Sequence, residues 1–218
     1  MSILRKENGG GRGYKGTSYA YDPSQSINQL KEAGFKKGSD GYFEPTSGPL
    51  KGKALAFTIQ SKTGNSIRSQ SEVLFQAQMK SIGIKINIQN VDANTFGTNI
   101  PNGDYQITEF AWDSTPFVSG NQPIYCSYTD MTHCDSNWTH SANAHVDQLM
   151  ASGSSAPSQS QENEDYNKAD AILWQNAVTL PLYQTPLFFA WSNNLKGVLP
   201  NTSSVGVTWN AENWSLGS

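Results

Sequence analysis

Residues 54–112 read ALAFTIQSKTGNSIRSQSEVLFQAQMKSIGIKINIQNVDANTFGTNIPNGDYQITEFAW, and this stretch decides the fold. Its apolar residues switch between a period of two and a period near 3.6, which separates strands from helices. The pattern predicts strands at 54–60, 84–89 and 105–111 and helices at 67–82 and 93–99. Strands joined by helices are typical of an α/β layer with parallel pairing, in which ligands bind at the edge formed by the strand ends.

The evidence for these elements is the spacing of apolar side chains. The first two strands alternate at Leu55, Phe57 and Ile59 and at Ile84, Ile86 and Ile88. The long helix is expected to bury one apolar stripe, made of Ile67, Leu74, Phe75, Met79 and Ile82. Gly83 is expected to end the long helix, and Pro101 with the Asn102–Gly103 turn is expected to end the short one.

Working outward towards the N-terminus, Asp22 and Pro23 suit the start of a helix, as N-cap and first helical residue. Gly34 is expected to end this helix. A turn-rich stretch follows at 36–53, and a short ribbon is predicted around 41–43. Residues 1–20 are interpreted as a flexible lead segment because they contain a Gly-rich run.

Towards the C-terminus, the pattern predicts a short helix at 143–150, a Ser-rich linker at 151–160 and a longer helix at 161–176. Residues 178–190 are apolar but contain Pro181 and Pro186, so we expect a bent or edge strand there. The last part, around 205–214, carries Trp209 and Trp214, which are expected to be exposed.

Composition narrows the class of protein. Charged residues make up 15% of the 218, against about 25% in an average soluble domain. A polar but weakly charged surface favours a secreted or cell-envelope protein. The net charge of −3 argues against nucleic-acid binding, which needs a basic face. Residues 1–13 contain no apolar signal-peptide segment, so the chain is either cytosolic or a piece of a longer exported protein, and the composition favours the second.

Two cysteines, Cys126 and Cys134, lie in a polar, turn-rich segment. They could be free thiols, or they could form a local disulfide of the kind that persists outside the cytosol. A zinc site is a third reading, because His133, His140 and His145 lie nearby, although the spacing matches no familiar ligand pattern. We favour the disulfide.

The segment Phe110 to Phe117 follows a predicted strand end and combines large aromatic residues with a carboxylate and hydroxyls. One interpretation is a core tryptophan followed by an Asx turn. The other is a recognition loop, in which Trp112 forms an apolar wall and Asp113 supplies a fixed negative charge. The sequence alone leaves both readings open.

Motifs for catalysis are absent from the sequence. It contains no nucleophile elbow, phosphate-binding loop, zinc-protease motif or dinucleotide fingerprint. Asp104, Asp113 and Asp147 could lie close together, but spacing alone does not show it. We therefore expect no catalytic residue, no resident cofactor and no metal. A sugar-binding module, with tryptophan and tyrosine for stacking, and an extracellular hydrolase are the alternatives to the reading below.

Several motifs, in order, resemble the family 5 extracellular solute-binding proteins, the peptide-binding components of ABC importers. The match covers roughly residues 14–218. The similar segments are Tyr21-Asp22-Pro23 with LKEAGF at 30–35, the helix and turn at 67–84, Gly103-Asp104-Tyr105, VDQLM at 146–150, YNKAD at 166–170, LPLY at 180–183 and Lys196-Gly197-Val198. The Trp112-to-Pro116 segment is most similar to actinobacterial members.

The resemblance implies a C-terminal α/β lobe over residues 21–218, with a mixed sheet flanked by helices in the manner of type II periplasmic binding proteins. It implies a peptide or related solute as ligand, ABC permease subunits and a missing N-terminal lobe as partners, and no nucleic acid. The tail at about 205–218 would pack on that lobe. The full-length protein would be extracellular or periplasmic and lipid-anchored.

The resemblance also carries the site residues. The implied ligand-binding residues are Trp112, Asp113, Ser114, Thr115 and Phe117. Asp113 is the nearest match to the family's acid that pairs with a peptide's amino group. Many members place that acid a few residues later, where this chain has Thr115-Pro116-Phe117. Some members carry a disulfide soon after this loop, which supports Cys126–Cys134.

Overall fold

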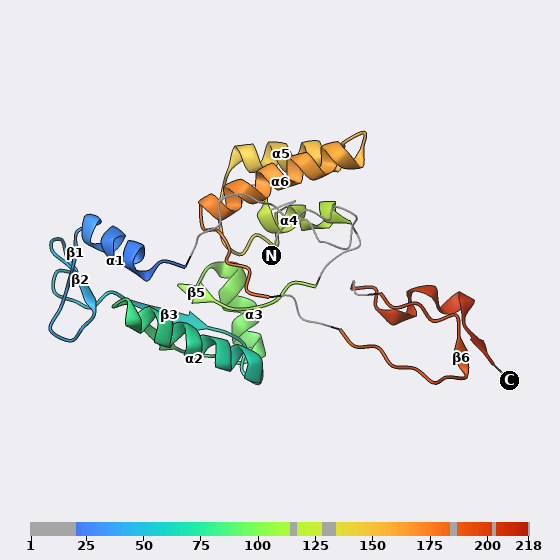
Figure 1. The fold of residues 1–218 in the computed structure, drawn as a ribbon, viewed down its shortest axis with the longest axis horizontal. Helices are drawn as coiled ribbons and strands as arrows, with labels where there is room; N and C mark the ends of the chain where they lie inside the picture. The colour runs from blue at the N-terminus through green and yellow to red at the C-terminus, as the bar shows by residue number, and fades with distance from the viewer. Residues whose placement is uncertain (1–20, 114–116, 128–133, 184–186, 202–203, 218) are drawn as a thin grey trace. The chain divides into compact units, whose positions relative to one another are not determined.

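The computed structural model describes residues 21–113, 117–127, 134–183, 187–201 and 204–217. The chain divides into two compact units, with the boundary between residues 111 and 112 (Figure 1). We call residues 19–111 the first unit and residues 112–218 the second unit. In the described part of the chain, no helix is long and apolar enough to cross a bilayer.

The first unit contains a parallel three-stranded sheet. Its central strand is β3 (Ala56–Gln60), which lies between β4 (Lys85–Ile88) and β5 (Ile107–Thr108). Helix α2 (Ser66–Ser81) connects β3 to β4, and α3 (Ala93–Asn102) connects β4 to β5. The α/β class and the parallel pairing predicted from residues 54–112 are confirmed. Strand β5 is shorter than the predicted strand at 105–111.

Helix α3 ends later than predicted. Pro101 lies in its last turn rather than beyond it. Gly103 adopts the left-handed conformation, with φ 77°, and its N–H donates to the carbonyl of Ile100 at 3.1 Å. The N–H of Asp104 donates to Asn99 at 2.8 Å. The glycine cap satisfies the last carbonyls, so the helix ends at Gly103 and tolerates the proline.

Helix α2 and its C-cap bury part of the predicted stripe, at Phe75, Met79 and Ile82, but not its other two residues. Ile67 and Leu74 are 56% and 59% exposed, whereas Glu72 is fully buried. The Glu72 carboxylate accepts a hydrogen bond from the side chain of Asn90, just beyond β4, at 2.7 Å. This polar contact turns position 72 towards the sheet. Phe75 and Met79, three and seven residues further on, share that face and are half-buried.

An antiparallel ribbon completes the first unit, together with α1 (Pro23–Glu32). The ribbon pairs β1 (Phe35–Lys37) with β2 (Phe43–Pro45). Asp22 caps α1 as predicted, because its carboxylate accepts the N–H of Gln25 at 2.9 Å. Gly34 follows the helix with φ 86°.

Gly83 fastens the ribbon to the turn between α2 and β4. Its carbonyl accepts the N–H of Phe43 at 2.7 Å, and its φ is 86°. A Cβ at this position would lie 2.8 Å from the buried ring of Phe43. Both the backbone conformation and the close ring require glycine here.

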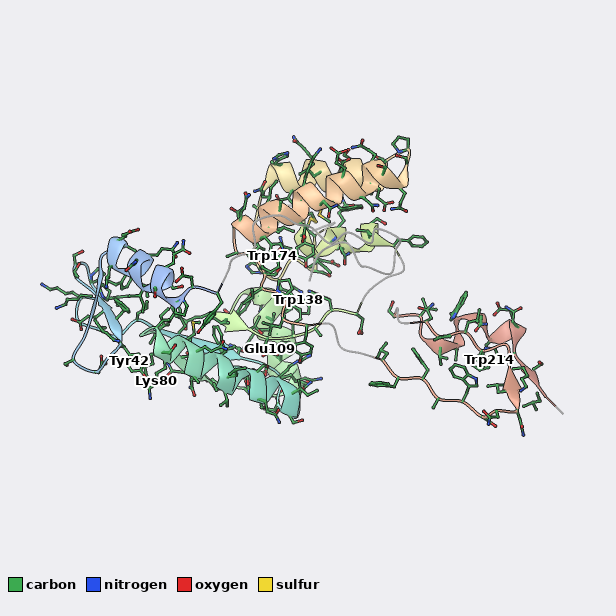
Figure 2. All side chains as sticks on the ribbon, viewed as in Figure 1. Tyr42, Lys80, Glu109, Trp138, Trp174 and Trp214 are labelled. Atoms are coloured by element: carbon green, nitrogen blue, oxygen red, sulfur yellow. A yellow bond between two sulfur atoms is a disulfide. The ribbon has the colours of Figure 1, made fainter. Side chains whose placement is uncertain are left out.

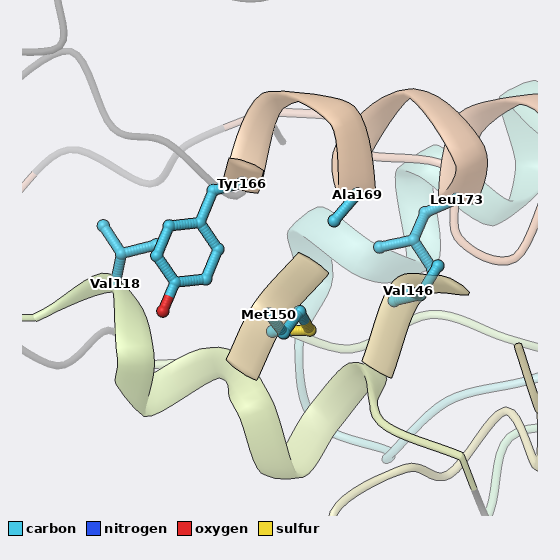
Figure 3. Packing of buried hydrophobic residues seen from close by; sticks show 6 residues of the cluster. All are labelled: Val118, Val146, Met150, Tyr166, Ala169 and Leu173. Atoms are coloured by element: carbon cyan, nitrogen blue, oxygen red, sulfur yellow. The ribbon is translucent and has the colours of Figure 1, made fainter. Parts of the chain in front are cut away.

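The second unit is built on a helical hairpin. Helix α5 (Ala144–Ser154) packs beside α6 (Gln159–Gln175), and η2 (Val118–Asn121) and α4 (Gln122–Tyr125) precede them. The core of this unit, shown in Figure 3, consists of Val118, Val146, Met150, Tyr166, Ala169 and Leu173.

The predicted Ser-rich linker at 151–160 is wrong, since most of it is helical. Helix α5 continues to Ser154, and only four residues separate it from α6. A Cβ on Gly153 would lie 2.9 Å from the ring of Tyr166 in α6. The small residues of this stretch therefore lie at a helix–helix contact, which composition alone does not distinguish from a linker.

The C-terminal part forms a small ribbon of β6 (Leu195–Lys196) and β7 (Ser215–Leu216), with η3 (Val207–Asn213) before β7. The described residues of the predicted strand at 178–190 form none, and Pro186 lies outside the described residues. Trp209 is exposed as expected. Trp214 is half-buried instead, because its indole N–H donates to the buried Asn210 side chain at 3.1 Å.

Candidate functional site

The most distinctive surface of the second unit is a pair of tryptophans. Trp112 and Trp138 lie with their ring centroids 4.5 Å apart and their planes at 44°. Both side chains are half-buried, so each ring keeps part of its surface accessible. Such aromatic faces pack against apolar or sugar-like groups of a ligand. Trp112 is therefore neither fully buried nor fully exposed, and it offers a partly open aromatic surface.

A disulfide precedes Trp138 in the chain. Cys126 and Cys134 are bonded, with their Cα atoms 5.6 Å apart, and both are buried. This confirms the predicted pairing and removes both sulfurs as zinc ligands. His133 lies outside the described residues. Among the residues that the structure describes, no group of three or more His, Cys, Asp or Glu side chains is placed to hold a metal.

The loop carrying Trp138 is fixed by its neighbour, Asn137. The buried Asn137 amide donates to the carbonyl of Cys126 at 2.6 Å and to that of Ser141 at 2.9 Å. The Asn137 side-chain oxygen accepts the hydroxyl of Thr139 at 2.7 Å. One amide thus ties both sides of the loop together, and this limits the positions that the Trp138 ring can take.

Asp147 has a structural role. Its carboxylate accepts the backbone N–H of Ser127 at 2.7 Å and also the Ser127 hydroxyl. The same hydroxyl accepts the N–H of Asn143, the N-cap of α5, at 3.0 Å. Asp147 therefore anchors the segment after Cys126 to α5. Asp104 belongs to the first unit, whereas Asp113 and Asp147 belong to the second.

The structure describes two of the other predicted site residues, Asp113 and Phe117, but not Ser114 and Thr115. Asp113 follows Trp112 directly and is exposed, and Phe117 is 74% exposed. Ser114 and Thr115 lie outside the described residues. The sequence analysis singled out Trp112 as a candidate but not Trp138, whose ring lies against it. The signal available for Trp138 was its position, four residues after the second cysteine of a predicted disulfide.

A carboxylate lies at the carboxyl edge of the sheet in the first unit. Glu109 follows β5, and both of its oxygens accept the Ser71 hydroxyl of α2, at 2.7 and 2.6 Å (Figure 2). This is the edge where open α/β sheets bind ligands. Sequence reasoning missed Glu109, although its place at the end of a predicted strand was a usable signal.

Comparison with known proteins identifies the family of this chain. The sequence profile of the bacterial extracellular solute-binding proteins, family 5 Middle, matches residues 5–130. The chain belongs to this family of solute-binding proteins. The oligopeptide-binding protein AppA of Bacillus subtilis is 25% identical over 182 residues, which are 82% of this chain and 32% of AppA.

Solved structures show the same fold. The structure of AppA from Bacillus subtilis in complex with a nonapeptide matches with a TM-score of 0.71 and 21% identity, over 95% of this chain and 40% of that one. NikZ from Campylobacter jejuni in complex with Ni(L-His) matches with a TM-score of 0.70 and 23% identity, over 91% and 40%. MelB from Agrobacterium fabrum in complex with stachyose matches with a TM-score of 0.64 and 13% identity, over 81% and 27%.

This chain matches only a part of each of these relatives. The chain spans 32% of the curated relative AppA and at most 40% of the three solved chains. Each relative is therefore more than twice as long as the part that this chain matches. The names of AppA and MelB describe binding proteins.

Proposed function

We propose that this chain is one lobe of the substrate-binding component of an ABC importer. The full-length protein would bind a peptide or a related small solute between two lobes and deliver it to membrane permease subunits. The observation that carries this proposal is the Trp112–Trp138 pair with exposed Asp113 beside it, in a chain of this family. The name of AppA supports a peptide as the solute.

The proposed chemistry is recognition without reaction. The two indole rings pack against apolar parts of the solute, and the Asp113 carboxylate pairs with a cationic group such as a peptide's amino terminus. Ser114, Thr115 and Phe117 belong to the same proposed surface because they follow directly in the chain. Closure of two lobes about a hinge would bury the solute, as in other periplasmic binding proteins.

The proposal places the protein on the extracellular or periplasmic face of the membrane, with a lipid anchor in the full-length form. The Cys126–Cys134 disulfide supports this location, because structural disulfides persist mainly in oxidising compartments. In the same proposal, the tail at about 205–218 packs on the missing N-terminal lobe.

A neutral oligosaccharide is the second candidate solute. A tilted pair of tryptophans suits the flat apolar face of a sugar ring, and one solved structure of this fold holds stachyose. The two candidates differ in charge. A peptide would use the Asp113 carboxylate, whereas stachyose carries no charge for Asp113 to pair with.

Calorimetry on the full-length protein tests the proposal. The panel contains short peptides with free amino termini, the same peptides N-acetylated, and stachyose. We expect free peptides to bind most tightly and acetylation to weaken them. We expect the 218-residue chain alone to bind with a dissociation constant of about 1 mM or weaker, equivalent to about −4 kcal/mol. Micromolar binding by this chain alone would contradict the proposal that it supplies only one of the two lobes that enclose the solute.

Matched variants locate the site. Asp113→Asn should weaken binding of free peptides about tenfold while leaving acetylated peptides unchanged, whereas Asp135→Asn, at another exposed aspartate of the second unit, should change neither. Trp138→Ala should weaken every ligand that binds, and Leu50→Ala, at an exposed apolar residue of the first unit, should weaken none. Equal effects of Asp113→Asn and Asp135→Asn would rule out the amine role of Asp113.

A further inference from the structure

A second surface lies on the first unit, away from the carboxyl edge of its sheet. It is an open groove of about 470 Å³ between α2 and the start of β4, and Tyr42 also lines it. Figure 2 labels Tyr42 and Lys80, which both line this groove. Helix α2 runs from the carboxyl edge of the sheet towards the amino edge, so the groove lies at the opposite end from Glu109.

The groove carries uncompensated positive charge. Lys80, from the last turn of α2, and Lys85, the first residue of β4, both line it. Within the described residues, neither ammonium group forms an ion pair, whereas Lys36 is paired with Glu44 at 3.1 Å. The other polar groups in the groove are neutral, including Asn87. Its chemistry therefore complements carboxylates.

Beside the lysines lies exposed apolar surface. Val73 and Ala77 line the groove from α2 and are exposed. Leu74 and Ile67 extend the apolar surface along the same helix, and both are more than half exposed. Contiguous exposed apolar residues beside charged ones are typical of protein interaction sites.

The groove is shaped for side chains rather than for an added strand. β4 is an edge strand, and its outward-facing carbonyl at Ile86 already accepts the side-chain amide of Gln76 at 2.7 Å. On the inner side, the N–H of Lys85 donates to Leu55, directly before β3, and the N–H of Gln89 donates to Ile59 of β3. A partner strand would have to displace Gln76. An amphipathic segment lying along α2 meets no such obstacle.

Charge over the whole unit points to a protein rather than to nucleic acid or lipid. The first unit has nine basic and eight acidic residues, a net charge of +1. Binding to a polyanionic backbone or an anionic membrane needs a broad basic face. Two lysines beside an apolar patch instead fit a short acidic segment.

We propose that this groove is a docking site for an acidic amphipathic segment of a protein partner. Carboxylates of the segment pair with Lys80 and Lys85, and its apolar side chains cover Val73, Leu74 and Ala77. The groove shares no residue with the proposed solute site, so the two proposals are tested by different substitutions and can fail independently.

The test uses the 218-residue chain and a short synthetic helical peptide with leucines on one face and glutamates on the adjoining face. A control peptide has glutamine in place of each glutamate. Amide NMR shifts are followed in the wild type, in Lys80→Glu/Lys85→Glu, and in Lys51→Glu/Lys53→Glu, a matched change at two exposed lysines of the same unit.

We expect the acidic peptide to shift amides in α2 and β4, with a dissociation constant on the order of 100 μM. The groove variant and the glutamine peptide should each weaken binding at least about tenfold, and the Lys51/Lys53 variant should leave it unchanged. Equal binding of the glutamine peptide, equal loss in both variants, or an absence of shifts would overturn the proposal.

Two further arms separate the source of the negative charge. Full competition by excess inorganic phosphate would identify a small-anion site instead. Lys80/Lys85-dependent pelleting of the chain with phosphatidylglycerol vesicles would identify a membrane contact. Either result overturns a protein partner. In the full-length protein, Lys80→Glu/Lys85→Glu should bind the solute with the same affinity as the wild type, as measured by calorimetry. A failure of the docking proposal would therefore leave the proposal on solute binding intact.

Discussion

At the scale of single residues, the side chain of Asn90 connects the ends of two strands with a helix. Its oxygen accepts the N–H of buried Ser61 at 2.9 Å, and its amide donates to Glu72 at 2.7 Å. The other Glu72 oxygen is buried and has no hydrogen-bond partner among the described residues. Asn90 thus supplies a hydrogen bond to one oxygen of a buried carboxyl group, and such groups are costly when left unpaired.

Asn90→Ala should therefore destabilise the chain by about 3 kcal/mol, because it leaves the Ser61 N–H and the Glu72 carboxyl without this partner. Urea unfolding measures the free energy. Asn94→Ala is the control, since Asn94 is exposed and uses only its backbone in the capping contacts of α3, and it should change stability by less than about 0.5 kcal/mol. Similar effects of the two substitutions would show that the buried network contributes little.

Tyr166 gives a prediction for alkaline pH. Burial, with a smaller contribution from the charge of Glu162, raises the pKa of Tyr166 to about 12, and its hydroxyl has no partner among the described residues. An unfolded tyrosine has a pKa of about 10, so the folded state favours the neutral phenol. The stability linked to this group is complete below pH 10 and is lost as the pH rises through 12.

Tyr166→Phe removes this ionisation and a buried unpaired hydroxyl. At pH 7 the variant should be at least as stable as the wild type. Above about pH 10 its melting temperature should fall less steeply than that of the wild type. Melting temperatures of both proteins across this range give the comparison. Parallel curves would mean that the phenol is not shielded in the folded state.

At the scale of elements, the close approach of α5 and α6 depends on Gly153. A Cβ there would meet the buried Tyr166 ring at 2.9 Å, so Gly153→Ala should destabilise the chain by about 1–3 kcal/mol despite alanine's better helix propensity. Gly97→Ala is the matched control in α3, where nothing lies within 4 Å, and it should stabilise by about 0.5–1 kcal/mol. Thermal melts measure both, and opposite signs are the expected result.

The elements also show what the sequence could and could not predict. The strands of the parallel sheet and the cap at Asp22 depend on local pattern, and both were predicted. The buried face of α2 was predicted only in part: Phe75 and Met79 are half-buried as expected, but the buried Glu72, which accepts a hydrogen bond from Asn90, has no apolar signal in the sequence. The Ser-rich stretch at 151–160 was misread because small residues serve both linkers and close helix contacts.

The candidate site shows the same limit. Trp112 was singled out because it directly follows the strand predicted at 105–111, although β5 itself ends at Thr108. Trp138 was not, because the two rings meet only through a loop held by a disulfide and by the buried amide of Asn137. Ring contacts between residues 26 positions apart depend on tertiary structure, which neither periodicity nor motif spacing encodes.

At the scale of the whole molecule, large apolar side chains between 180 and 191 are exposed. Phe188 is 90% exposed, and the others are Leu180, Leu182, Tyr183, Leu187 and Trp191. Exposed apolar surface of this extent marks an interaction site or an aggregation risk. The chain spans only about a third of its curated relative AppA, so the proposed second lobe of the full-length protein is the natural cover for these residues.

The 218-residue chain should therefore self-associate as its concentration rises, while the full-length protein stays monomeric. Leu182→Ser/Phe188→Ser should reduce the association of the chain, because it removes two of the exposed apolar side chains. Leu50→Ser, at a similarly exposed leucine of the first unit, should leave it unchanged. Sedimentation velocity at several concentrations measures this. In the full-length protein, the second lobe is expected to bury Phe188, so the same double substitution should lower the melting temperature. An unchanged melting temperature would mean that residues 180–191 stay exposed and that the second lobe does not cover them.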